Sequence, residues 1–311
     1  MKCPRCSHQH KKKLGPICGR CERSFVFFGD SRMTDGRFAN LVKQASGNGT
    51  YFFTERQLCS EWFAKMRGTP SSFWKILGVV GTVTGLTSLA LPEISWLPWI
   101  GFGGLLVLAL QMVKVSAPEQ RIFDAQFAKW SSAEPMEGLL RGCALDSPPP
   151  EWNEPQMLDV GVEALLVVDD PLLVDFFVLN QAHTEHRVLV VSSHGYPDYI
   201  LPAVKRVMET QPDVPVCYLH GTGVTAEELR QLLNAKVSMT AGVHRDLGWN
   251  WKEASNSGRV RKAGHDKAPE IALDWLPPKK LMEGLGRALS TEVRFAEATG
   301  LEDGDQDMHF G

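Results

Sequence analysis

The start of this 311-residue chain lacks any long apolar run, which argues against a cleaved signal peptide. Two later stretches, Ile76–Leu91 and Ile94–Val113, are mainly apolar and contain no charged residue, and only two residues separate them. A membrane-spanning helix needs about 20 mainly apolar residues to cross roughly 30 Å of hydrocarbon. The second stretch has this length, and the first reaches it when the three residues before it are counted. The sequence therefore predicts a transmembrane helical hairpin over 71–115.

Basic residues flank the predicted hairpin on both sides, whereas its short turn carries only Glu93. Short flanks rich in Lys and Arg stay in the cytoplasm. We therefore expect a multi-pass protein of a bacterial inner (cytoplasmic) membrane, with both termini cytoplasmic and the lipid bilayer as a partner. The alternative is a buried hairpin in a soluble protein, but the rest of the chain offers little apolar sequence to surround it.

The seven cysteines do not suggest a disulfide framework, because a reducing cytoplasm disfavours one. Four of them form two C-x-x-C pairs, Cys3 with Cys6 and Cys18 with Cys21. Two such turns can supply the four thiolates of a closed tetrahedral metal site. Residues 1–28 resemble the N-terminal zinc ribbons of many bacterial membrane and nucleic-acid-associated proteins. That resemblance implies a structural Zn²⁺ that helps a small segment to fold.

Acidic residues are scarce near the N-terminus. Residues 1–70 contain thirteen Lys and Arg against five Asp and Glu, a net charge of +8, so the rest carries −11 of the total −3. A basic segment attracts anionic lipid or nucleic acid, although solvation alone also explains such charge.

Helical patterns surround the predicted hairpin. Residues 29–70 are expected to form a small module of two short helices around a Gly-Asn-Gly turn. Thr54 and Gln57 have the spacing of a capping box at the start of the second helix. Residues 116–155 are expected to be partly helical and then to form a Pro-rich linker.

From residue 156 to 290 short apolar runs alternate with helical patterns, which predicts a parallel sheet covered on both faces. The expected strands and helices, in chain order, are Glu163–Val168, Pro171–Asn180, Arg187–Ser192, Asp198–Glu209, Pro215–His220 and Thr225–Leu233. Functional groups gather where such strands end, and these positions hold Asp169, His194 and His220. Residues 291–311 are acidic at their end and are expected to be a disordered tail.

The segments LLVVDDPLLVDFF, VLVVSSHGYPD and PVCYLHGTGVTAEEL resemble, in this order, the Toprim domain of the A subunit of type IIB topoisomerases. Gly195, Pro197 and Asp198 match the turn that opens a helix in that family. Asp169 stands where the family has a catalytic Glu. Gly221 and Gly223 stand where it has two metal-binding Asp residues, and glycine offers no ligand. The resemblance thus implies a degenerate, non-catalytic, Toprim-like (Rossmann-like) domain, without a counterpart of the DNA-cleaving tyrosine domain.

Together these observations predict a multi-domain α/β membrane protein that binds a partner, a second copy of itself or a ligand without catalysis. One alternative is a membrane-tethered nucleic-acid binder. Another is a metal-dependent enzyme that uses Asp169, His194 and His220, since two His and a carboxylate suit a transition metal. A third is a nucleotide sensor in which the glycines at 221 and 223 hold a phosphate.

Overall fold

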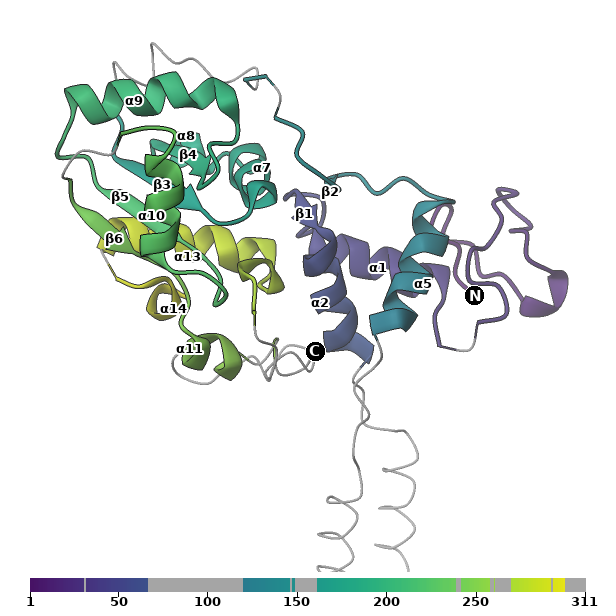
Figure 1. Ribbon diagram of the computed structural model, residues 1–311. Coiled ribbons are helices and arrows are strands. Elements are labelled where there is room, and N and C mark those ends of the chain that lie inside the picture. The colour runs from purple at the N-terminus through teal and green to yellow at the C-terminus, as the bar shows by residue number, and fades with distance from the viewer. Residues whose placement is uncertain are drawn as a thin grey trace, which may run out of the picture.

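The computed structural model of the chain is shown in Figure 1. It describes residues 1–30, 32–66, 120–145, 147–148, 161–238, 242–257, 260, 270–291 and 293–299. An N-terminal ribbon, a group of three helices and an α/β domain make up this part of the molecule, and the helices lie between the other two.

The ribbon consists of two tight turns joined by a loop. Isolated antiparallel bridges between Lys2 and Gln9 and between Ile17 and Ser24 close the turns. The joining loop contains a short 3-10 helix, η1 (Lys12–Leu14). Its apolar interior is small, with three buried residues: Cys3, Cys18 and Phe25.

Three helices follow: α1 (Asp35–Ala45), α2 (Glu55–Met66) and, after the predicted hairpin, α5 (Gln120–Ser131). They confirm the two short helices and the partly helical segment expected from the sequence. Aromatic rings join them, since Trp62 of α2 lies edge-on to Phe123 of α5 at 5.8 Å between ring centroids.

The predicted capping box at the start of α2 is confirmed. The Gln57 amide donates to Thr54 Oγ1 (3.2 Å), and the Thr54 amide donates to Gln57 Oε1 (2.9 Å). Just before the helix, strand β1 (Phe53–Thr54) pairs in parallel with β2 (Leu139–Leu140). These contacts fix the chain where it passes from the helical group to the α/β domain.

The α/β domain contains a four-stranded parallel sheet in the order β4-β3-β5-β6. Its strands are β3 (Ala164–Val168), β4 (Val188–Ser192), β5 (Val216–Leu219) and β6 (His244–Asp246). The first three are fully buried, which agrees with their continuous apolar sequence. The parallel α/β fold of this region is therefore confirmed.

Helices cover both faces of the sheet (Figure 1). The elements beside and after the strands are α7 (Pro171–Leu179), α8 (Ala182–Glu185), η3 (Asp198–Ile200), α9 (Leu201–Thr210), α10 (Ala226–Asn234), α11 (Trp251–Asn256), η4 (Leu273–Trp275), α13 (Pro278–Thr291) and α14 (Phe295–Ala298). Because alternate strand residues point to opposite faces, Leu165 and Val167 pack with α9 and α10, and Leu166 and Val168 pack with α7 and α13.

The core on the α7 and α13 face continues into the helical group, where it includes Phe38, Trp62 and Phe123. Buried hydrogen bonds cross the same boundary: Ser60 Oγ donates to the Trp275 carbonyl (2.8 Å) and Gln57 Nε2 to the Leu276 carbonyl (3.1 Å). The helical group and the α/β domain thus share one core.

The domain also continues past the predicted boundary at residue 290. Helix α13 ends at Thr291, and α14 follows with Phe295 fully buried. The start of the predicted tail over 291–311 is therefore part of the folded domain, and its remainder, residues 300–311, lies outside the described residues.

The prediction of a membrane protein is contradicted. Within the described part of the chain, no helix is long and apolar enough to cross a bilayer. The longest helix there, α13, has 14 residues and spans about 21 Å, less than the roughly 30 Å of hydrocarbon. The prediction was based on the hydropathy and length of two stretches and on the basic residues beside them, and both stretches lie outside the described residues. We therefore drop the transmembrane hairpin, the multi-pass inner-membrane localisation with cytoplasmic termini, and the bilayer as a partner.

Candidate functional site

The four cysteines of the ribbon converge on one point. Their Sγ atoms all lie within 4.8 Å of one another, with 3.6 Å between Cys3 and Cys21 and 3.7 Å between Cys6 and Cys18. A disulfide bond is about 2.05 Å long, and the four thiols are free. Thiolates placed tetrahedrally at about 2.3 Å from a metal would be about 3.8 Å apart. The cluster is thus close enough to hold a metal ion.

The two turns that carry the cysteines have the same backbone geometry. The Ser7 amide donates to the Cys3 carbonyl and the Glu22 amide to the Cys18 carbonyl, both at 2.9 Å. Ser7 and Glu22 both adopt a left-handed conformation, with φ of 58° and 59°. Hydrogen bonds from the backbone amides of Arg20 and Cys21 lower the pKa of Cys18 to about 6. These hydrogen bonds favour the thiolate form of Cys18 that binds metal, whereas burial and the neighbouring thiols raise the pKa of Cys21 to about 11.

The histidines near these turns are not part of the cluster. His10 is buried, its Nε2 lies 2.8 Å from the Gly15 carbonyl, and its ring lies 5.1 Å from that of Phe25. It holds the loop between the two turns in place. His8 also lies outside the four-cysteine group.

A buried arginine fixes the ribbon to the helical group. Arg23 donates through Nε to Glu134 (2.6 Å) and through Nη1 to Asp35 (3.0 Å), and its guanidinium lies 5.5 Å from the Trp130 ring centroid. Asp35 also accepts hydrogen bonds from the backbone amides of residues 26 and 27. The orientation of the ribbon relative to α1 and α5 is therefore set by charged groups that are mostly shielded from solvent.

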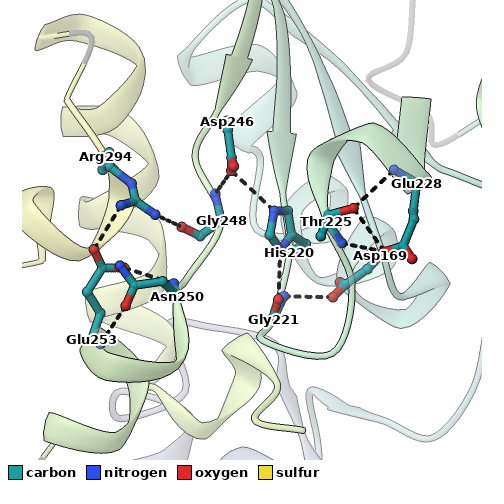
Figure 2. A network of polar contacts seen from close by, with 10 residues as sticks. All are labelled: Asp169, His220, Gly221, Thr225, Glu228, Asp246, Gly248, Asn250, Glu253 and Arg294. Carbon is teal, nitrogen blue, oxygen red and sulfur yellow. Dashed lines mark hydrogen bonds and ion pairs between the residues drawn. The ribbon is translucent and has the colours of Figure 1, made fainter. Parts of the chain in front are cut away.

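At the sheet edge, Asp169 follows β3 and its carboxylate is held by two amides. Oδ2 accepts from the Gly221 amide at 2.8 Å (Figure 2), and Oδ1 accepts from the Asp170 amide, also at 2.8 Å. Burial raises the pKa of the Asp169 carboxyl above its usual value. The side chain thus connects the ends of β3 and β5, and its oxygens are already engaged.

His220 follows β5 and is 5% exposed. Its Nδ1 lies 2.7 Å from the Gly221 carbonyl and its Nε2 lies 3.2 Å from the Asp246 carboxylate. Because both partners only accept, both ring nitrogens must donate, which requires the imidazolium. Burial lowers the pKa of His220, but the hydrogen bonds to Asp246 and Gly221 outweigh this and raise it. The hydrogen bond to His220 is the main cause of the lowered pKa of Asp246. Asp246 was not among the site residues predicted from the sequence.

The network extends from Asp246 to the C-terminal helices (Figure 2). The Gly248 amide donates to Asp246 Oδ1 (2.8 Å), and Arg294 donates to the Gly248 carbonyl (3.3 Å) and pairs with Glu253 (3.1 Å). The polar side chains at this edge therefore bind one another and join elements of the fold.

The crevice at this edge is filled by the chain itself. In parallel sheets ligands bind where the strand order reverses, which here lies between β3 and β5. The Thr222 amide donates to the Ile271 carbonyl (3.0 Å), and the Ile271 amide donates to Thr222 Oγ1 (2.9 Å). A Cβ at Gly221 would lie 2.5 Å from the Ile271 oxygen, and one at Gly223 would lie 2.7 Å from Glu270 Cγ. Close packing against backbone atoms thus requires glycine at 221, whereas at 223 only the exposed side chain of Glu270 would have to move to admit a larger residue.

The predicted trio of Asp169, His194 and His220 does not form a ligand cluster. His194 is exposed in the turn after β4, and within the described residues the four cysteines are the only group of three or more potential ligands that lie close together. Asp246 was not predicted, because β6 is only three residues long and two of its side chains are exposed, so no apolar run marks it as a strand.

Comparisons of the chain with protein-family models, with curated proteins and with solved structures find no match. The function must therefore be argued from the two sites themselves. The Toprim resemblance stays a prediction.

Proposed function

We propose that this chain is a non-catalytic nucleic-acid-binding protein whose ribbon, stabilised by zinc, makes the contact. The observation that carries this proposal is the charge exposed on the ribbon. Residues 1–28 contain one acidic residue, Glu22, against six exposed basic side chains: Lys2, Arg5, Lys11, Lys12, Lys13 and Arg20. Cations on one small module are suited to neutralise backbone phosphates.

Zinc is the metal that four cysteine thiolates suit best, since a Cys₄ set forms a closed tetrahedral site. Such a site has no open position for a substrate, so its role is structural. The ribbon has a very small apolar interior, which is consistent with a fold that depends on metal.

The α/β domain is, in this proposal, a degenerate Toprim-like scaffold. Asp169 has the expected position after the first strand, but both of its oxygens accept backbone amides. Residues 270 and 271 occupy the space beside Gly221 and Gly223. Metal-dependent strand cleavage needs carboxylates that hold Mg²⁺ against phosphate, and among the described residues no group of three or more potential ligands lies close together at this edge.

The test is fluorescence anisotropy of labelled single- and double-stranded DNA and RNA with the zinc-loaded full chain. We expect Lys11, Lys12 and Lys13, changed together to Gln, to lower affinity at low salt by about tenfold or more. The control changes Lys205, Lys236 and Lys279 to Gln, which removes the same charge from exposed positions of the α/β domain. Equal loss in both variants would indicate non-specific attraction and would contradict a ribbon contact.

A protein partner is the second candidate, because two aliphatic side chains of the ribbon are exposed. Leu14 and Ile17 are 64% and 54% exposed, beside the same lysines. If neither DNA nor RNA binds at low salt, the next experiment is to crosslink a protein partner to the ribbon. The Leu14→Ser variant is expected to lower the yield of crosslinked partner.

A further inference from the structure

We propose that a cavity between α1 and α2 binds an amphipathic anion, meaning a small molecule that joins a carboxylate or phosphate to an apolar body. The cavity has a volume of about 300 Å³, near the lower end of the range for small-molecule sites, roughly 300 to 1,000 Å³. It is separate from both the ribbon surface and the sheet edge.

One face of α1 forms most of its wall. Arg37, Asn40, Leu41 and Gln44 line the cavity, and their spacing of three and four residues places them in one stripe along the helix. The opposite side is supplied by the last two residues of α2, Lys65 and Met66. The site is thus built from two helices that are already packed together.

The charge of the lining has one sign. Arg37 and Lys65 contribute two cations, Asn40 and Gln44 contribute amides, and the lining contains no carboxylate. Arg37 Nη1 donates to the Arg32 carbonyl (3.2 Å), which leaves further guanidinium N–H groups available. Within the described part of the structure, neither cation forms an ion pair. An anionic group would satisfy both.

The floor of the cavity is apolar. Met33 is 1% exposed and Leu41 is 4% exposed, and Met66 is half-buried beside them. Thioether side chains adapt to apolar ligands of varied shape. An inorganic anion would leave this surface uncovered, and a neutral apolar molecule would make no use of the two cations, which are exposed at the rim. A ligand with both parts matches the whole lining.

A second cavity of about 410 Å³ provides an internal contrast. It lies between α2, α5, the start of α7 and η4, and its lining has three acids, Glu55, Asp170 and Asp274, against the single cation Arg56. Its charge disfavours anions. Selective binding of an anion is therefore expected at the α1–α2 cavity.

The experiment is isothermal titration calorimetry of the zinc-loaded full chain with decanoate and with decyl phosphate, below their micellar concentrations. Inorganic phosphate, decyltrimethylammonium and a neutral decyl glycoside serve as comparison ligands. We expect at least one of the two amphipathic anions to bind more tightly than all three comparison ligands. The stronger of the two then shows whether a carboxylate or a phosphate is preferred.

Variants locate the site. Arg37→Gln and Lys65→Gln should each lower the affinity for the preferred anion by about tenfold. Lys43 is exposed on α1 but lies outside the lining, so Lys43→Gln should leave this affinity unchanged. Circular dichroism spectra that match the parent show that each variant is folded. Absence of anion binding, equal binding of the neutral glycoside, or binding unchanged in the Arg37→Gln, Lys65→Gln double variant would overturn the proposal.

Discussion

Adding one methyl group at residue 221 tests whether the sheet-edge crevice is closed. In Gly221→Ala the new Cβ would lie 2.5 Å from the Ile271 carbonyl oxygen and 3.1 Å from the Ala272 Cα. Both are backbone atoms, and that carbonyl accepts the Thr222 amide at 3.0 Å, so the segment cannot move away without losing a hydrogen bond. Overpacking of this kind costs about 1–3 kcal/mol, and the lost hydrogen bond adds about 1 kcal/mol.

We therefore expect Gly221→Ala to lower the free energy of unfolding by about 2–4 kcal/mol, measured by urea titration and followed by circular dichroism. Gly142→Ala is the matched control, because a Cβ there meets no atom within 4 Å, and its effect should stay within about 0.5 kcal/mol. An equally small effect at residue 221 would show that residues 270 and 271 do not pack against the sheet edge. The sheet edge would then have room for a ligand, which contradicts a closed, non-catalytic crevice.

Three further perturbations test the networks around the two sites. The pKa of His220 is raised in the folded protein, so its contribution to stability is complete below pH 6.5 and is lost as the pH rises through the raised pKa. The pKa of Asp246 is lowered, so its contribution is complete above pH 3.8 and is lost as the pH falls through the lowered pKa. His220→Gln should therefore flatten the alkaline decline in unfolding free energy, and an unchanged pH profile would contradict the imidazolium. Cys18→Ser, or removal of metal by a chelator, should abolish ribbon structure and zinc content together, as measured by circular dichroism and atomic absorption; a ribbon that stays folded without metal would refute a structural role. Arg23→Met should lower the free energy of unfolding by about 3 kcal/mol, because it leaves the buried Asp35 carboxylate without its cation. Arg187→Met breaks an exposed ion pair and should lower it by less than about 1 kcal/mol. Similar losses in urea titrations of the two variants would show that Arg23 does not anchor the ribbon.

Short-range sequence patterns predicted the features that depend on residues close together in the chain. The buried strands were visible as short apolar runs, and β3 begins one residue from its predicted start and ends at its predicted residue. The spacing of the two C-x-x-C pairs indicated that four thiols would converge. The capping box at Thr54 was found for the same reason, because its two partners are three residues apart.

Contacts between distant parts of the chain could not be predicted in this way. The Toprim comparison identified missing acids at Gly221 and Gly223, but not that the close approach of the Ile271 backbone, 50 positions later, requires glycine at 221. The ion pairs of Arg23 join three separate segments. The α1–α2 cavity depends on how two helices pack, which neither helix shows by itself. The membrane prediction was based on hydropathy, length and flanking charge, and the two stretches that carried it lie outside the described residues.

The salt dependence of nucleic-acid binding tests the central claim most directly. For a single strand the logarithm of the binding constant falls with the logarithm of salt concentration by about 0.7 for each phosphate that the protein neutralises. If Lys11, Lys12 and Lys13 contact phosphates, changing all three to Gln should reduce this slope by about 2, while the matched change at Lys205, Lys236 and Lys279 leaves it unaltered. A slope that is the same in the parent and the ribbon variant would contradict the account.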